Sequence, residues 1–299
     1  MPSTRELRRR IKSTRNTAQI TKAMQMVSAV KMKRAQDQAL NGRPYGINLS
    51  ESLARLLPKV EKESHPLLFG NDSKNIGVIL LSTDKGLCGS LNTNLFRSIM
   101  NSNLNTGSVT YYTIGKKARN FVVRVGKDLA ADFENSDVIT FRQAVQLSKL
   151  AIEGFKNNEL GEIYLVYPHF ASTIKQEPRI VKLLPVDLQS VIANEVKQSQ
   201  NEIASSRTPR NDKDGEFLFE PNVDTLLDSL LIHHIETKIY QALLETKASE
   251  HSARMVAMKN ATDNAKDLVE DLQLTYNQTR QDAITREILE ISSASAAME

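Results

Sequence analysis

The spacing of apolar and small residues predicts one long helix at each end of the chain. Near the start, such residues recur at alternating intervals of four and three, which is heptad spacing. The predicted positions are Leu7, Ile11, Thr14, Ala18, Thr21, Gln25, Ser28, Met32, Ala35 and Ala39. Neither glycine nor proline follows Pro221. That last stretch of about 78 residues is long enough for a helix of about 115 Å, at a rise of about 1.5 Å per residue.

The C-terminal stretch repeats the same spacing, which predicts that the two helices pair as an antiparallel coiled coil. Its predicted seam positions are Leu226, Leu230, His233, Thr237, Tyr240, Leu244, Lys247, His251, Met258, Ala261, Ala265, Leu268, Leu272, Thr275 and Thr279. Many of these residues are polar or small, where a two-stranded coiled coil favours Leu or Ile. We therefore expect the pair to be marginally stable by itself, and the longer second helix to extend beyond the first.

Between the two helices, short apolar runs alternate with amphipathic segments. The run "NIGVILLS" (75–82) is typical of a buried strand. Further strands are predicted at 108–115, 162–170 and 178–186, and helices at 91–102, 116–125 and 141–158. Strands that alternate with helices form βαβ units and a largely parallel sheet. The predicted fold class is therefore α/β, with a Rossmann-like domain inserted between the two helices of a coiled coil.

These elements predict a division of the chain into five segments. Residues 1–57 are a shaft helix, 58–73 a linker, 74–188 the α/β domain, and 217–299 contain the long C-terminal helix. Residues 189–216 are polar, rich in Ser and Asn, and without sustained periodicity. We expect them to be a disordered surface insertion, because loops tolerate insertions at low free-energy cost.

Composition places the chain among soluble or peripheral proteins. Hydrophobic residues make up 40% and charged residues 25%, which is ordinary for a globular protein. No apolar run approaches the ~18 residues that a membrane-spanning helix needs, and the first residues lack the apolar core of a secretory signal. Cys88 is the only cysteine, which excludes an intramolecular disulfide and favours a reducing compartment.

Charge is distributed unequally between the two helices. About ten basic residues and only one acid, Glu6, lie between Met1 and Arg34, whereas acids outnumber bases after Asp263. A basic helix of this kind can bind nucleic acid. We favour the simpler interpretation of a solvated face that is partly neutralised by the acidic second helix.

The sequence offers little that points to catalysis. The segment "STDKGLCGSLN" (82–92) follows a strand and precedes a helix, where phosphate loops lie, but it matches neither phosphate-loop pattern. A tight turn that needs Gly86 and Gly89 is the preferred interpretation, with Cys88 as a small buried residue rather than a nucleophile. The five histidines form no metal-ligand pattern, and no cofactor fingerprint is present.

Four blocks, in order along the chain, closely resemble one family. They are "IKSTRNTAQITKAMQMVSAVKMKRAQ", "STDKGLCGSLNTNLF", "ASEHSARMVAMKNATDNA" and "LTYNQTRQDAITREILEI". The chain is similar through these blocks to the gamma subunits of bacterial F-type ATP synthases. The resemblance extends from about Arg5 to Ala297, apart from the insertion.

The resemblance implies the role of a rotor. The two helices would form a central stalk inside a ring of three alpha and three beta subunits, and the α/β domain would hold an epsilon subunit and the membrane ring of c subunits. The chain would couple proton-driven rotation to ATP synthesis in the beta subunits. It would not be an enzyme itself and would need no cofactor, metal or nucleic acid. It would lie on the cytoplasmic face of the inner membrane, attached to that membrane only through the c ring.

The resemblance also implies particular contact residues. Those matching the family's contacts to the beta subunits are Lys22, Met24, Arg280, Gln281, Thr285 and Glu287. Phe217 and Glu220 match the segment near the c ring or the epsilon subunit. The family's C-terminal Gly-Ala pair is replaced here by Ala294 and Ser295, and we expect little effect because both have adequate helix propensity. The alternative interpretation is a nucleotide- or nucleic-acid-binding α/β protein with a coiled-coil arm.

Overall fold

The computed structural model describes residues 3–56, 65–102, 104, 108–186 and 223–296. Outside these described residues lie the polar segment 189–216 and residues 58–64, the first part of the predicted linker 58–73. The chain divides into two compact units, Met1–Val30 with Arg254–Glu299, and Lys31–Ala253. Each unit is described by itself below.

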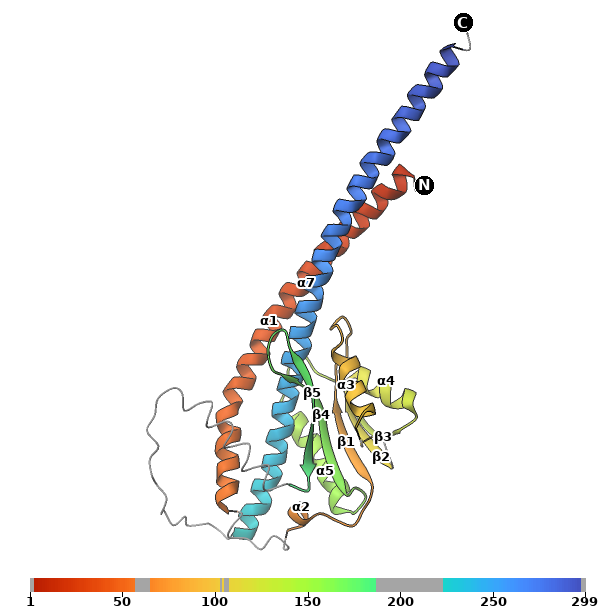
Figure 1. The fold of residues 1–299 in the computed structure, drawn as a ribbon. Coiled ribbons are helices and arrows are strands. Elements are labelled where there is room, and N and C mark those ends of the chain that lie inside the picture. Colours follow the sequence, from red (N-terminus) through yellow and green to blue (C-terminus); the bar gives the residue numbers. More distant parts are fainter. Residues whose placement is uncertain (1–2, 57–64, 103, 105–107, 187–222, 297–299) are drawn as a thin grey trace. The chain divides into compact units, whose positions relative to one another are not determined.

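The two predicted long helices are present. Helix α1 spans Thr4–Leu56 and contains 53 residues, and helix α7 spans Val223–Ala296 and contains 74 residues (Figure 1). Gly42 and Pro44 lie inside α1. The pattern of helix formers therefore carries the helix through two residues that usually end one.

The α/β domain is built on a five-stranded sheet with the order β3-β2-β1-β4-β5. The strands are β1 (Ile76–Leu81), β2 (Val109–Ile114), β3 (Asp128–Phe133), β4 (Glu162–Phe170) and β5 (Gln176–Leu184). Strand β1 pairs in parallel with β2 and β4, and β2 with β3, whereas β5 is antiparallel to β4. The prediction of a largely parallel sheet is confirmed. Strand β3 was not predicted.

Helices cover both faces of this sheet. They are α3 (Leu91–Met100), α4 (Lys116–Val125) and α5 (Phe141–Lys156), with the short α2 (Pro66–Phe69) ahead of β1. Side chains of β1 alternate: Val78 and Leu80 pack with α3 and α4, and Ile79 with α5 and α7. Figure 1 shows the same two layers around the sheet. Because both of its faces are buried, β1 reads as a continuous apolar run.

The first part of α7 packs through two faces. Its most deeply buried apolar side chains are Leu227, Leu231, Ile235, Ile239 and Leu243, in the core that includes α5 and the sheet. Of the predicted seam residues, His233 and Thr237 lie beside α1. Leu244 belongs to the core with the sheet, and Tyr240 packs against Phe141 of α5. The Tyr45 ring lies 5.6 Å from the His233 ring, edge to face, and Thr237 lies beside Gly46. The heptad pattern therefore found part of the α1 contact but did not predict that this part of α7 also packs on the sheet.

In the other unit, the first 30 residues of the chain pair with the second half of α7. In this part of α1 the most buried side chains are Leu7, Thr21 and Ser28, all predicted. Along α7 the buried or half-buried positions are Met258, Thr262, Ala265, Val269, Leu272, Tyr276, Thr279 and Ala283. The predicted position Ala261 is half-buried as well, beside the more deeply buried Thr262, whereas the predicted Leu268 and Thr275 are exposed and wrong by one residue.

The seam of that unit is polar at its centre. The hydroxyls of Thr21 and Thr262 are 2.7 Å apart and buried. Near its far end, Arg8 donates a hydrogen bond to the Tyr276 hydroxyl at 2.8 Å, with its guanidinium 5.7 Å from the ring centroid. Small and hydroxyl-bearing residues allow a close approach but bury little apolar surface, so this pairing contributes less free energy than a Leu seam would.

Candidate functional site: exposed helix surfaces and a buried polar junction

The residues expected to contact beta subunits lie on exposed parts of the two long helices. Lys22 is exposed, and its ammonium donates to the Gln25 side chain at 3.3 Å. Met24 is half-buried. Arg280, Gln281, Thr285 and Glu287 are all exposed on α7. Phe217 and Glu220 lie outside the described residues.

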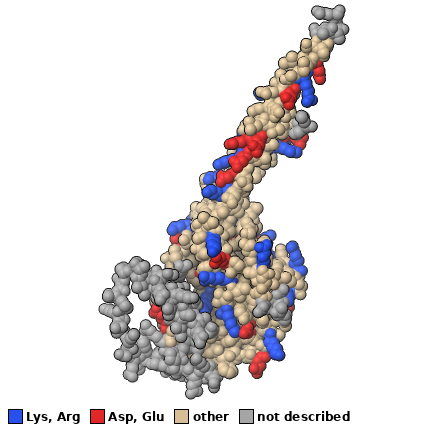
Figure 2. All heavy atoms as spheres, viewed as in Figure 1, with Lys and Arg blue, Asp and Glu red and all other residues tan. Residues whose placement is uncertain are grey.

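The spacing of the four α7 residues arranges them as two pairs. Arg280 and Glu287 are seven apart, and Gln281 and Thr285 are four apart, so each pair shares one stripe of the helix. The helix therefore presents a cation and an anion along one stripe and two neutral polar groups along the next. Figure 2 shows that side chains of both signs also occur along the visible face of the two helices.

Large apolar side chains are exposed on both helices. On α1, Ile20, Met26, Val27 and Val30 are between 55% and 61% exposed. On α7, exposed apolar residues continue to the end of the helix, at Leu274, Ile284, Ile288, Leu289 and Ile291. Several large apolar side chains exposed on one helix are typical of an interaction site. The α7 residues were not predicted, although Ile284, Ile288 and Ile291 have the spacing of one helix face.

A polar segment of α7, Glu245–Ser252, is buried against the α/β domain, and we call it the polar junction. Seven of its eight residues are polar, and all are at most 9% exposed. Burying polar groups costs free energy unless they are hydrogen-bonded. Their partners in the α/β domain lie in three segments: the one after β3, strand β4 itself, and the turn between β4 and β5.

The contacts of the junction are as follows. Ser249 donates to the Pro168 carbonyl at 2.9 Å and Ser252 to the Thr173 carbonyl at 2.6 Å. The His169 ring nitrogen Nδ1 lies 2.6 Å from the Glu245 carboxylate. The Lys247 ammonium donates to the Asn135 carbonyl at 3.2 Å and lies 3.5 Å from the Glu250 carboxylate. Lys247 was predicted to face the coiled-coil seam, and it contacts the α/β domain instead.

The loop after β1 is closed by contacts within the protein. Ser82 accepts a hydrogen bond from the Ala118 amide at 2.7 Å, and the Asp84 carboxylate accepts one from the Lys116 amide at 2.9 Å. Both amides belong to the first turn of α4, so Ser82 and Asp84 tie the start of the loop to a neighbouring helix. These contacts are consistent with the predicted structural turn.

The two glycines of this loop differ. Gly89 has a φ of 59°, which favours glycine. Gly86 lies outside the left-handed region and has open space around it, so the prediction that both are required is right only for Gly89. Cys88 is 3% exposed and accepts a hydrogen bond from Asn92 at 3.3 Å, which confirms it as a buried residue.

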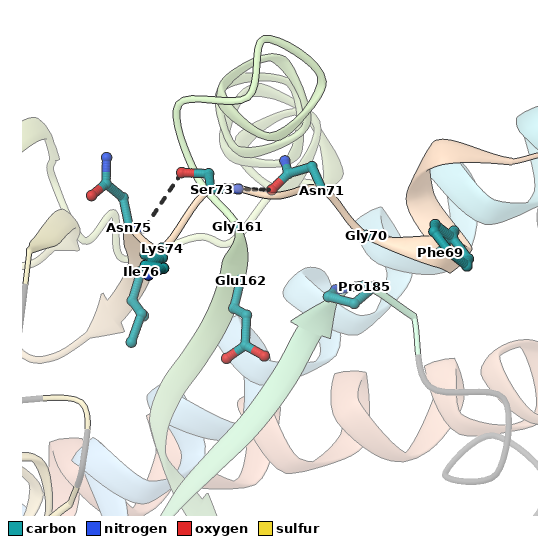
Figure 3. A pocket seen from close by; sticks show the side chains of 10 residues that line it. All are labelled: Phe69, Gly70, Asn71, Ser73, Lys74, Asn75, Ile76, Gly161, Glu162 and Pro185. Carbon is teal, nitrogen blue, oxygen red and sulfur yellow. Dashed lines mark hydrogen bonds between the residues drawn. The ribbon is translucent and has the colours of Figure 1, made fainter.

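An open hollow of about 410 Å³ lies beside the amino ends of β1 and β4 (Figure 3). The Asn71 amide donates to the carbonyls of Phe155 and Leu160 at 2.8 and 2.7 Å. Glu162 accepts from Lys182 and from Tyr164, both at 2.7 Å. The Lys182 hydrogen bond lowers the pKa of the Glu162 carboxyl. Asn71 therefore holds the loop before β1 in place, and the Glu162 contacts join β4 to β5.

The fold and these surfaces define the class of the protein: a two-helix coiled coil with an α/β domain inserted between its helices, exposing interaction surfaces on both helices. No helix in the described residues is long and apolar enough to cross a membrane.

Comparisons with known proteins identify the family. A model of the ATP synthase family matches residues 3–298. The chain is 45% identical to the ATP synthase gamma chain of Methylacidiphilum infernorum, over all of both chains. It is 41% identical to that of Opitutus terrae, over 99% of both. The chain belongs to the ATP synthase gamma chain family, and it is thus a stalk subunit of an enzyme complex.

Solved structures share the fold. The chain resembles one from the central stalk and c ring of the Tetrahymena thermophila mitochondrial ATP synthase, with 25% identity and a TM-score of 0.60, over 81% of this chain and 99% of that one. It also resembles one from the Euglena gracilis mitochondrial ATP synthase, with 20% identity and a TM-score of 0.66, over 99% and 94%. The expected combination of terminal helices and a mostly parallel sheet is confirmed.

Proposed function

We propose that this chain transmits rotation between a c ring and three catalytic beta subunits, and that it performs no chemistry itself. The observation that carries the proposal is the end of α7, where Leu274, Ile284, Ile288, Leu289 and Ile291 are 46% to 72% exposed. Such a helix would be unfavourable in water, and a surrounding ring of alpha and beta subunits would cover it.

The contacts to the beta subunits are proposed at two levels. Arg280, Gln281, Thr285 and Glu287 form polar contacts near the end of α7, and Met24 beside Lys22 faces an acidic loop of a beta subunit. Because charged groups lie along one stripe of α7 and neutral polar groups along the next, each beta subunit meets a different surface at a given moment. Unequal contacts are what allow a shaft to shift the populations of open and closed sites.

The remaining partners are proposed for the α/β domain. It holds an epsilon subunit and the c ring, with Phe217 and Glu220 as the contact residues. Membrane association is then indirect, and the chain lies on the cytoplasmic face of the inner membrane. Support comes from the family, whose members in bacteria match the chain over its full length.

Reconstitution tests this function. Purified alpha and beta subunits are mixed with and without the chain, and ATP hydrolysis and the size of the complex are measured. We expect the chain to join a complex of three alpha and three beta subunits and to raise steady hydrolysis. A chain that does not copurify with these subunits, or that leaves hydrolysis unchanged, would contradict the proposal.

A further inference from the structure

We propose that the polar junction, Glu245–Ser252, locks the register of α7 on the α/β domain, so that rotation of the domain turns the helix without slip. This inference rests on the proposed rotor function. It assigns a positioning role to Lys247, Ser249 and Ser252, which are distant in sequence from the residues proposed to contact beta subunits.

The first argument is the contrast between two kinds of contact on the same helix. On the N-terminal side of the junction, α7 packs on the domain through Leu227, Leu231, Ile235 and Ile239. Apolar contacts are non-directional, so a rotation of α7 that exchanges one aliphatic side chain for another is weakly opposed. Hydrogen bonds weaken steeply when their angle changes, and they therefore specify one orientation of the helix.

The second argument is the distribution of the partners. Lys247 contacts Asn135 in the segment after β3, Ser249 contacts Pro168 in β4, and Ser252 contacts Thr173 in the turn between β4 and β5. Three separate segments thus hold less than two turns of one helix. A rotation or axial shift of α7 breaks all three contacts together, and the freed groups would be left buried without partners, which is costly.

The third argument is a chain of hydrogen bonds that leads into the centre of the sheet. The Asn135 carbonyl accepts from Lys247, and the Asn135 side-chain amide donates at 2.6 Å to the carbonyl of Ser82, directly after β1. Strand β1 is the middle strand of the sheet. Ser82 in turn accepts from the first turn of α4. The Lys247 ammonium is thereby tied to the central strand and, through it, to a helix on the opposite face.

Buried polar groups are poor sources of stability but can specify one arrangement. Lys247 is 4% exposed and Glu250 is 4% exposed, where aliphatic residues would pack at least as favourably. A role in holding one register explains why charged groups occupy these positions in a helix that carries load.

The test uses the complete ATP synthase in inverted membrane vesicles. Lys247→Met removes the ammonium and keeps an unbranched side chain of similar length. Lys149→Met, at an exposed lysine of α5, is the matched control. ATP hydrolysis and ATP-driven proton uptake are measured on the same vesicles. We expect Lys247→Met to keep hydrolysis while the ratio of proton uptake to hydrolysis falls several-fold, and Lys149→Met to keep both.

A second variant guards against a simple folding defect. Ser249→Ala with Ser252→Ala removes two of the three directional contacts without leaving a buried charge, and should lower the same ratio. Spin labels at Ser229→Cys on α7 and Lys117→Cys on α4, with Cys88→Ala, report the position of the helix in the assembled complex. We expect a narrow distance distribution with the native junction and a broad or displaced one in both variants.

The outcomes are separable. A native chain that does not assemble with alpha and beta subunits contradicts the rotor function itself. If the native chain couples and both junction variants couple equally well with an unchanged distance distribution, the register lock is wrong. It is also wrong if hydrolysis and proton uptake fall in equal proportion, because that is the result of a purely structural role.

Discussion

At the scale of single residues, His234 shows what burial without a partner does. The side chain is 3% exposed, and its Nε2 has no hydrogen-bond partner within the described part of the chain. Burial, and secondarily the charge of Lys238, lowers its pKa to about 3. The folded protein therefore holds a neutral imidazole over a pH range in which the unfolded chain binds a proton.

This difference predicts a pH dependence of stability. The folded pKa of His234 lies below the ordinary value. Above a pH of about 6.5 the ring is neutral in both the folded and the unfolded chain, so it does not make stability depend on pH. Below that pH the unfolded chain binds a proton that the folded protein does not, so the free energy of unfolding falls by about 1.4 kcal/mol per pH unit. His234→Leu should remove that part of the slope. Urea unfolding of both proteins between neutral and mildly acidic pH measures it. Equal slopes for the two proteins would show that His234 becomes protonated in the fold.

Met24 gives the second prediction at this scale. The side chain is half-buried beside the exposed Lys22, at the position proposed to face an acidic loop of a beta subunit. Met24→Lys would form a charge-assisted contact, roughly twice as strong as a neutral one, that holds in one rotary position. We expect lower proton uptake per ATP hydrolysed, with Met24→Leu as the control. Unchanged coupling in Met24→Lys would count against the lever contact.

At the scale of elements, what the sequence predicts depends on how local the signal is. Helix α4, Lys116–Val125, has the predicted bounds, because glycines flank it on both sides. Strand β3 was missed because it is an edge strand with alternate exposure and two Asp residues, which weakens its apolar pattern. In α7, a small or apolar residue also stands next to many of the predicted seam positions. Heptad spacing alone therefore could not distinguish Ala261 from Thr262.

For the candidate sites too, what could be predicted depends on whether the signal is local in the sequence. Exposed contact residues such as Arg280 and Glu287 were assigned only through resemblance to a family, since a single exposed charge carries no local signal. The polar junction was missed because its partners, Pro168 and Thr173, offer backbone carbonyls, which every residue has. Its residues were instead attributed to the seam, where heptad spacing placed Lys247 and His251.

The seam between α1 and α7 predicts an unusual response to a larger apolar residue. Ala265 is 8% exposed in the tight helical pair, whereas its neighbour Asn264 is exposed. Ala265→Leu should lower the free energy of unfolding by about 1–3 kcal/mol through overpacking, although Leu suits ordinary coiled coils. Asn264→Leu should change it by about 0.5 kcal/mol or less. Urea unfolding followed by circular dichroism measures both, and a stabilised Ala265→Leu would mean that the seam has space to spare.

At the scale of the whole molecule, two segments of α7 depart from the usual distribution of polar residues outside and apolar residues inside. Charged and hydroxyl groups are buried at the polar junction, while large aliphatic side chains are exposed along the last part of α7. For a protein that worked alone, both choices would be unfavourable. They are consistent with a chain whose stable environment includes other subunits, and whose internal contacts must resist displacement as well as unfolding.

The exposed end of α7 therefore predicts opposite effects of one change on two properties. Ile284→Ser with Ile288→Ser and Ile291→Ser should reduce self-association of the isolated chain, measured by light scattering. The same variant should bind alpha and beta subunits more weakly, because each buried aliphatic side chain contributes about 1.5 kcal/mol or more. Gln273→Ser with Asn277→Ser and Gln278→Ser, at exposed polar positions of the same helix, is the control and should alter neither property. If the apolar variant assembled as tightly as the native chain, the end of α7 would not be enclosed by the ring, and the proposal that depends on it would fail.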